Sequence, residues 1–166
     1  VIGFVPQKGV LFSGTIESNI KYGNPEMSDK QMIEAAQIAQ ATEFIESKPE
    51  KYQEPIAQGG SNVSGGQKQR LSIARTLSKG SKIILFDEAT SALDNKSQEY
   101  IKKTIDNLVK DHTIVIVAHR LSTIVDADVI NVIDKGKLEA TGAHEELLKK
   151  SKVYKSLYSN EFTSVE

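Results

Sequence analysis

Apolar residues recur at helical spacing in the first third of the chain and predict a small helical lobe over roughly residues 15–60. The segment at 29–40, "DKQMIEAAQIAQ", places its methionine and its three alanines on one face, which predicts an amphipathic helix with Ser28 as its N-cap. A second, short helix is expected around Phe44. The stretch at 47–62 mixes two prolines and two glycines with polar residues, so we expect it to be a connector.

Helical and strand patterns alternate over the rest of the chain. Ser64 begins a segment with apolar residues at helical spacing, and Gly80 ends it. The runs "KIILFD" at 82–87 and "TIVIVA" at 113–118 carry no polar alternation, which predicts two strands that are each buried on both faces.

Further elements complete the alternation. A helix that Asp94 or Asn95 caps joins the two buried strands, and "DVINVID" at 128–134 predicts a third strand. A short strand at 137–140 and amphipathic helix over 144–158 follow. The order strand, helix, strand, helix, strand predicts an α/β fold with a parallel sheet and right-handed crossovers.

Composition narrows the class of protein. The chain has 166 residues, 39% hydrophobic and 26% charged, which is typical of one ordinary globular domain. The net charge is −1 and only three of the 21 basic residues are arginines, so we expect no nucleic-acid partner. There are no cysteines, which excludes disulfides and thiolate metal sites. We expect neither a signal peptide nor a membrane helix, because no apolar run approaches 18 residues.

Ionisable residues follow the two strands that we expect to be buried. Asp87 and Glu88 end one strand, and His119 follows the other. Because ligands of open α/β sheets bind at the carboxyl ends of the strands, these side chains are candidates for one site. One carboxylate would ligate Mg²⁺ and the other would orient and deprotonate a water. Two solvated acids and a structural histidine are the alternative.

The segment "SNVSGGQKQR" at 61–70 predicts an anion site at the beginning of a helix. Ser64 and Gln67 have the spacing of a capping box. Gly65 and Gly66 leave the amides of the first turn uncovered, and phosphate binds readily at such helix N-termini. A glycine in a helix costs about 1 kcal/mol against alanine. Capping explains Ser64, whereas the close approach of a ligand would explain the two glycines.

A phosphate-wrapping loop of the form G-x-x-x-x-G-K-[ST] does not occur in the sequence. The only Gly-Lys pair is Gly136-Lys137, which Leu138 follows. The chain also begins with "VIGFVPQ", which has the pattern of the middle of a strand, and it lacks an initiator methionine. We therefore expect a piece of a longer protein.

Five stretches, in order, resemble the motifs of the nucleotide-binding domain of ATP-binding cassette (ABC) transporters. "VSGGQKQR" at 63–70 is similar to the family signature LSGGQ. The others resemble the Q-loop, the Walker B motif with its glutamate, the D-loop and the switch-histidine region: "GFVPQ" at 3–7, "IILFDE" at 83–88, "SALD" at 91–94 and "IVAHR" at 116–120. "LFSGTIESNIKYG" at 11–23 is similar to the exporter branch of the family.

The resemblance implies two ligands, ATP and Mg²⁺, and a role for each matched residue. Toward one ATP, Gln7 would touch Mg²⁺ or the attacking water, Asp87 would hold Mg²⁺ through water, Glu88 would be the general base, and His119 would contact the γ-phosphate. Toward the ATP of an opposing subunit, Ser64, Gly65, Gly66 and Gln67 would clamp the γ-phosphate. Asp94 would link the two sites across a dimer interface.

The resemblance also implies the organisation of the whole protein. The fold would be a P-loop NTPase-type parallel sheet flanked by helices, with an inserted helical subdomain and without the Walker A strand. Residues 1–8 would be the Q-loop strand, 9–79 the helical subdomain with the signature helix, 80–150 the ATPase core, and 151–166 the C-terminal helix and tail. Partners would be a second cassette and a transmembrane permease domain in the same polypeptide, at the cytoplasmic face of a membrane.

The sequence departs from the family pattern at several positions. Val63 stands where the signature has leucine, and "IAQGG" at 56–60 lacks the acid that many exporters carry there. Without the Walker A half, the chain alone is expected to be inactive. Two other hypotheses stay open: a soluble ABC ATPase of DNA repair or translation, and a non-catalytic regulatory fragment.

Overall fold

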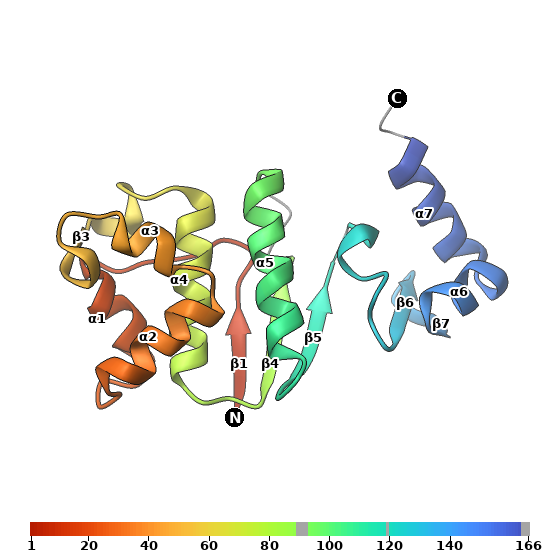
Figure 1. Ribbon diagram of the computed structural model, residues 1–166. Coiled ribbons are helices and arrows are strands. Elements are labelled where there is room, and N and C mark those ends of the chain that lie inside the picture. Colours follow the sequence, from red (N-terminus) through yellow and green to blue (C-terminus); the bar gives the residue numbers. More distant parts are fainter. Residues whose placement is uncertain (89–92, 119, 164–166) are drawn as a thin grey trace. The chain divides into compact units, whose positions relative to one another are not determined.

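The computed structural model describes residues 1–88, 93–118 and 120–163 (Figure 1). His119 and the first two residues of "SALD", Ser91 and Ala92, lie outside the described residues. The chain divides into two compact units, Val1–Val117 and Ala118–Glu166.

A parallel sheet is the framework of the first unit. Its strands are β1 (Ile2–Val5), β4 (Ile83–Asp87) and β5 (Thr113–Val117), and their order in the sheet is β1-β4-β5. Both pairings are parallel, and the alternation of strand and helix predicted the pairing of β4 with β5. The carboxyl ends of the three strands therefore meet at one edge of the sheet.

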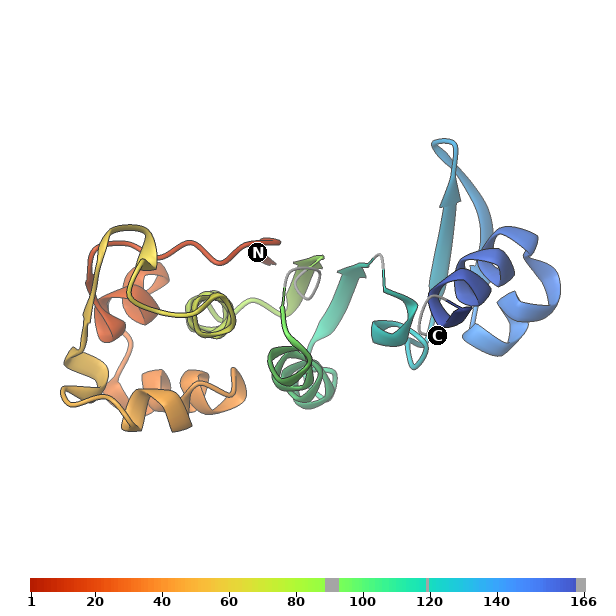
Figure 2. The same cartoon turned by 90° about the horizontal axis from the view of Figure 1, so that it is seen from above.

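Two long helices, α4 (Gly65–Ser78) and α5 (Asn95–Leu108), cover one face of this sheet (Figure 2). Val5, Ile84 and Phe86 are at most 1% exposed and form a hydrophobic core with the apolar residues of both helices. Gly80, with a φ of +67°, follows α4 in the left-handed conformation expected of a residue that ends a helix.

The opposite face of the sheet is only partly covered by the described residues, so the prediction that β4 and β5 are buried on both faces is wrong here. Burial alternates along both strands. Five large apolar side chains of this face are 41–62% exposed: Ile2, Phe4, Ile83, Val115 and Val117. An apolar run indicates which residues avoid water, but it does not indicate which element covers each face.

The helical lobe precedes α4 and consists of short elements. Ser28 caps α2 (Asp29–Ile38) and Phe44 lies in α3 (Thr42–Glu46), both as predicted. The lobe also contains elements that the sequence did not indicate: β2 (Gly14–Thr15), α1 (Ile16–Ile20), η1 (Lys21–Gly23), η2 (Lys51–Gln53), β3 (Pro55–Ile56) and η3 (Gln58–Gly60). β2 and β3 pair antiparallel, which joins the two ends of the lobe.

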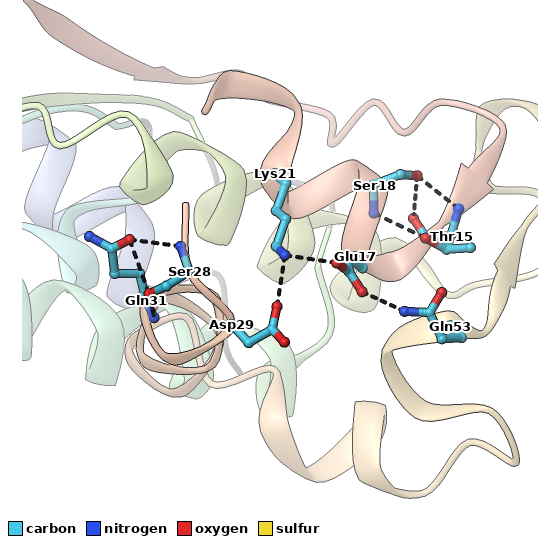
Figure 3. Close-up of polar contacts among 8 residues, drawn as sticks. All are labelled: Thr15, Glu17, Ser18, Lys21, Ser28, Asp29, Gln31 and Gln53. Carbon is cyan, nitrogen blue, oxygen red and sulfur yellow. Dashed lines mark hydrogen bonds and ion pairs between the residues drawn. The ribbon is translucent and has the colours of Figure 1, made fainter. Parts of the chain in front are cut away.

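Polar contacts connect the elements of the lobe (Figure 3). The Lys21 ammonium lies 2.7 Å from a Glu17 carboxylate oxygen and 2.8 Å from one of Asp29, so it connects α1 with α2. The Gln53 amide donates a hydrogen bond to the other Glu17 oxygen and brings η2 to the same point. The two hydrogen bonds that Lys21 donates raise its pKa, the bond to Asp29 more than the bond to Glu17.

The second unit contains an antiparallel strand pair and two helices. β6 (Ile130–Asp134) pairs with β7 (Lys137–Gly142) through a turn at Lys135 and Gly136, both with positive φ. The strand predicted at 128–134 is therefore not a further strand of the parallel sheet, because its hydrogen-bonding partner is the next strand in sequence. The unit also holds η4 (Leu121–Thr123), α6 (His144–Lys150) and α7 (Lys152–Thr163). No helix in the described ranges of either unit is long and apolar enough to cross a membrane.

Candidate functional site

Two of the predicted site residues lie together where β4 ends. Asp87 is the last residue of β4 and pairs with Val117, the last residue of β5. The amide of Glu88 donates a hydrogen bond of 2.7 Å to the Val117 carbonyl oxygen. Gln7 follows β1 by two residues, at the same edge of the sheet. The prediction that His119 joins this edge concerns a residue outside the described ranges.

The backbone of Glu88 has a φ of +46°, in the left-handed region. This conformation costs a residue with a side chain about 1–2 kcal/mol, so the surrounding structure must maintain it. The hydrogen bond to Val117 is one restraint that does so. The backbone of Glu88 thus departs from the extended strand conformation that ends at Asp87.

The loop that carries Gln7 is held against α4. The Gln69 side-chain amide donates a hydrogen bond of 3.0 Å to the Pro6 carbonyl oxygen, and Gln69 is only 1% exposed. A Cβ on Gly9 would lie 2.7 Å from the backbone of Lys68, so glycine allows the loop to approach the helix. Sequence reasoning missed Gln69. The available signal was a glutamine on the side of α4 that also carries the apolar residues.

The beginning of α4 has the predicted capping box. The Gln67 amide donates to the Ser64 hydroxyl oxygen at 3.2 Å, and the Ser64 amide donates to the Gln67 side-chain oxygen at 3.1 Å. Since α-helices leave their first amides without intrahelical acceptors, the N–H groups of Gly65 and Gly66 have no partner within the helix, and Gly65 is exposed whereas Gly66 is buried. A Cβ on Gly65 would meet nothing within 4 Å, so the approach to this turn is open.

Helix packing explains why position 66 is a glycine. A Cβ on Gly66 would lie 2.2 Å from the Ser97 hydroxyl oxygen and 2.9 Å from the Ser97 Cβ. The first turns of α4 and α5 thus touch at this pair. Packing against Ser97 accounts for glycine at position 66, and the approach of a ligand is needed as an explanation only for Gly65.

Asp94 is the N-cap of α5, which decides between Asp94 and Asn95. Its carboxylate accepts a hydrogen bond of 2.7 Å from the Ser97 amide, and this bond lowers the pKa of Asp94. Asp94, Ser64 and Gln67 line one cavity of about 300 Å³ between α3, α4 and α5. The structure therefore brings the signature-like turn and the cap of α5 together, as two sides of a single hollow.

The fit of a magnesium ion depends on Asp87. Among the described residues, no three carboxylate or histidine side chains gather into a group that could hold a metal. These residues therefore do not form a site in which protein side chains alone surround the ion. Mg²⁺ commonly takes one or two carboxylates and completes its shell with waters and phosphate oxygens. A single carboxylate at the end of β4 fits that mode, with a nucleotide as the main source of ligands.

Comparisons with known proteins agree on one family. The family model described as ABC transporter matches residues 1–91. An ATP-binding/permease protein of Staphylococcus aureus strain NCTC 8325, named provisionally for multidrug export, is 48% identical over 158 residues. The corresponding protein of the bovine strain RF122 has the same identity over the same length. The match covers 95% of this chain and 27% of each relative, so the chain spans about a quarter of their length.

A solved structure gives the same result for the fold. The structure of a bacterial Atm1-family ABC exporter with ATP bound is similar to this chain with a TM-score of 0.90 and 41% sequence identity. The likeness covers 99% of this chain and 29% of that chain. The α/β fold with a parallel sheet flanked by helices is therefore shared with an exporter of this family.

Proposed function

The chain belongs to the ABC transporter family, and from this premise we propose that it forms part of an ATP-hydrolysing domain that powers export across a membrane. The observation that carries the proposal is the beginning of α4, where Gly65, which faces open space, follows the N-cap Ser64. Asp87 and Glu88 at the end of β4 supply the carboxylates that hydrolysis needs. Folding explains neither residue, since a Cβ on Gly65 would meet nothing within 4 Å and Glu88 has a strained backbone.

Within one site, we assign the residues at the carboxyl edge of the sheet to the chemistry. Mg²⁺ bound to the triphosphate would offset charge on the transferred phosphoryl group. Asp87 would hold this ion, and Gln7 would contact it or the attacking water. Glu88 would orient that water and accept its proton, a role that typically contributes about 10²- to 10⁴-fold in rate. His119 would contact the γ-phosphate.

The turn at the beginning of α4 would serve a second ATP, bound by an opposing subunit. Amides at a helix N-terminus attract an anion through their N–H groups and the helix dipole. Ser64, Gly65, Gly66 and Gln67 would clamp the γ-phosphate there. Asp94, which lines the same cavity, would link the two sites across the dimer interface. ATP-driven closure of two such domains would then be the step that is coupled to transport.

We infer the domain organisation of the intact protein from that of its relatives. The relatives are named as ATP-binding/permease proteins, which favours a permease domain in the same polypeptide and the cytoplasmic face of a membrane as the location. We assign residues 9–79 to a helical subdomain that faces the permease, residues 1–8 and 80–150 to the ATPase core, and 151–166 to a C-terminal helix and tail. The partner cassette would be a second copy or a related chain.

One substitution in the intact protein tests the catalytic assignment. Glu88→Gln keeps the size and hydrogen-bonding capacity of the side chain but removes the base. We expect ATP binding to persist, turnover to be abolished, and the closed dimer to accumulate with ATP. Measured turnover close to that of the unsubstituted protein would remove Glu88 from the role of base. The 166-residue chain alone should show no magnesium-dependent hydrolysis above a protein-free blank.

A further inference from the structure

We propose that Arg70 is a positioning residue, which holds the phosphate-binding turn of α4 in place relative to the helical lobe and to α5. This inference rests on the function proposed above for Ser64–Gln67. Arg70 lies one and a half turns into α4, and its side chain reaches three separate elements. Within the described ranges, its hydrogen bonds and ring contacts go to Gly66, Gln40, Phe44 and Tyr100 rather than to the carboxyl edge of the sheet, so its effect on ATP would be indirect.

The first two connections are hydrogen bonds to carbonyl oxygens. The Arg70 Nε donates to the Gly66 carbonyl oxygen at 3.3 Å, within the signature-like turn. The Arg70 Nη1 donates to the Gln40 carbonyl oxygen, also at 3.3 Å. Gln40 follows α2 with a φ of +58°, a left-handed conformation that is uncommon for residues other than glycine. One guanidinium thus joins the first turn of α4 to the strained end of α2.

The third connection is a stack of rings on the same guanidinium. Its carbon lies 4.3 Å from the ring centre of Tyr100 on α5 and 5.1 Å from that of Phe44 on α3. The Tyr100 hydroxyl in turn donates to a Glu43 carboxylate oxygen at 3.4 Å, next to Phe44. A planar cation placed over aromatic rings is a geometry that lysine does not reproduce.

Stability alone does not explain this arginine. Arg70 is only 8% exposed, and no carboxylate of the described residues forms an ion pair with it. Burying a cation without an ion pair is unfavourable, and an apolar residue of similar size would avoid that cost. Burial accordingly lowers the pKa of Arg70, while Tyr100 and the carboxylates of Glu43 and Asp94 act in the opposite direction. The guanidinium provides directed contacts to three elements, which an apolar side chain would not.

The cavity beside Arg70 explains why such contacts matter. Ser64, Gln67, Arg70 and Asp94 all line the hollow of about 300 Å³ between α3, α4 and α5. Close packing therefore does not hold the turn on this side, and the Arg70 contacts cross the gap instead. A displacement of α2 or α3 would move the guanidinium, and with it the Gly66 carbonyl and the amides that we assign to phosphate.

The test uses ATPase kinetics of the intact protein, with kcat, the KM for ATP and the melting temperature measured for each variant. Arg70→Lys keeps the charge and loses the planar stack, and Tyr100→Leu removes the ring. We expect each to lower kcat about tenfold, because misplacement of a binding group by about 1 Å can slow a reaction up to 10²-fold. Tyr100→Phe keeps the ring and should retain kcat within twofold. The double variant should be no slower than the slower single variant, because both remove one coupling.

The outcomes separate this proposal from the function on which it rests. Normal kcat in Arg70→Lys, in a protein that is itself active, would overturn the role of Arg70 alone. An equal loss of kcat in Tyr100→Phe and Tyr100→Leu would overturn the role of the ring stack. A loss of kcat that occurs only in variants with a lowered melting temperature would overturn it too, because the effect would then be one of stability. An unsubstituted protein without ATPase activity would overturn both proposals. Should Arg70→Lys fail to fold, the two Tyr100 variants decide the question.

Discussion

Gly66 and Ser97 are in direct contact where the first turns of α4 and α5 meet, and no room remains for a Cβ on Gly66. Gly65, its neighbour, faces open space. The two glycines of the signature-like turn are therefore under different constraints. One permits the contact between two helices, and the other leaves a helix N-terminus uncovered.

Alanine at the two positions should consequently have opposite effects on stability. Gly66→Ala creates a steric clash with Ser97, and overpacking of this kind destabilises by about 1–3 kcal/mol. Gly65→Ala should raise stability by up to about 1 kcal/mol through helix propensity, while it hinders ATP at the turn. Thermal unfolding without nucleotide and ATPase assays of the intact protein measure the two effects. A stabilised Gly65→Ala protein with full activity would contradict the phosphate assignment.

The cap of α5 should lose its effect in acid. The hydrogen bond from the Ser97 amide lowers the pKa of Asp94 below the usual 3.8. The folded protein thus favours the ionised carboxylate, and this stabilisation is complete above pH 3.8 and disappears as pH falls through the folded-state pKa. Melting temperatures of the protein and of Asp94→Asn should differ by a constant amount near neutral pH and converge in acid. Asp106→Asn, on the exposed side of α5, controls for the lost charge.

The hydrogen bond between Gln69 and Pro6 should stabilise the loop that carries Gln7. Gln69→Met keeps the length of the side chain and removes the amide, which should cost about 1 kcal/mol in the free energy of unfolding. Because the Pro6 carbonyl then loses its donor, the loop should also exchange its amide hydrogens faster. Gln37→Met, at an exposed position of α2, is the matched control. Equal unfolding free energies for the two variants would show that this bond contributes nothing.

The exposed face of the sheet should make the 166-residue chain self-associate. Apolar patches of this kind are uncommon on monomeric proteins and promote association. Val115→Thr combined with Val117→Thr keeps β-branched side chains while it adds two hydroxyls to the patch. Light scattering over a range of protein concentrations should show weaker association of this variant. Val109→Thr is the control, since Val109 is 55% exposed but lies at the end of α5. An unchanged scattering curve for the double variant would rule out this face.

The features that the sequence predicted correctly depend on neighbouring residues. Ser28 and Ser64 cap their helices through hydrogen bonds to residues three positions away, so the pattern is visible in a short segment. The missed features depend on residues that are distant in sequence. Gln69 meets Pro6, and Ser97 meets Gly66, only after the sheet and its helices have assembled. The strand at 128–134 was misassigned because its apolar pattern suits a parallel or an antiparallel partner equally well.

The strained backbone of Glu88 would oppose stability to the catalytic role that we propose for this residue. Glycine would adopt a φ of +46° without the penalty of about 1–2 kcal/mol that a side chain brings. A glycine here should therefore give a protein that resists heat better than the natural one. The chain retains the glutamate despite this penalty, so heat resistance gained by Glu88→Gly together with a loss of turnover would measure a trade-off between folding and activity at this position.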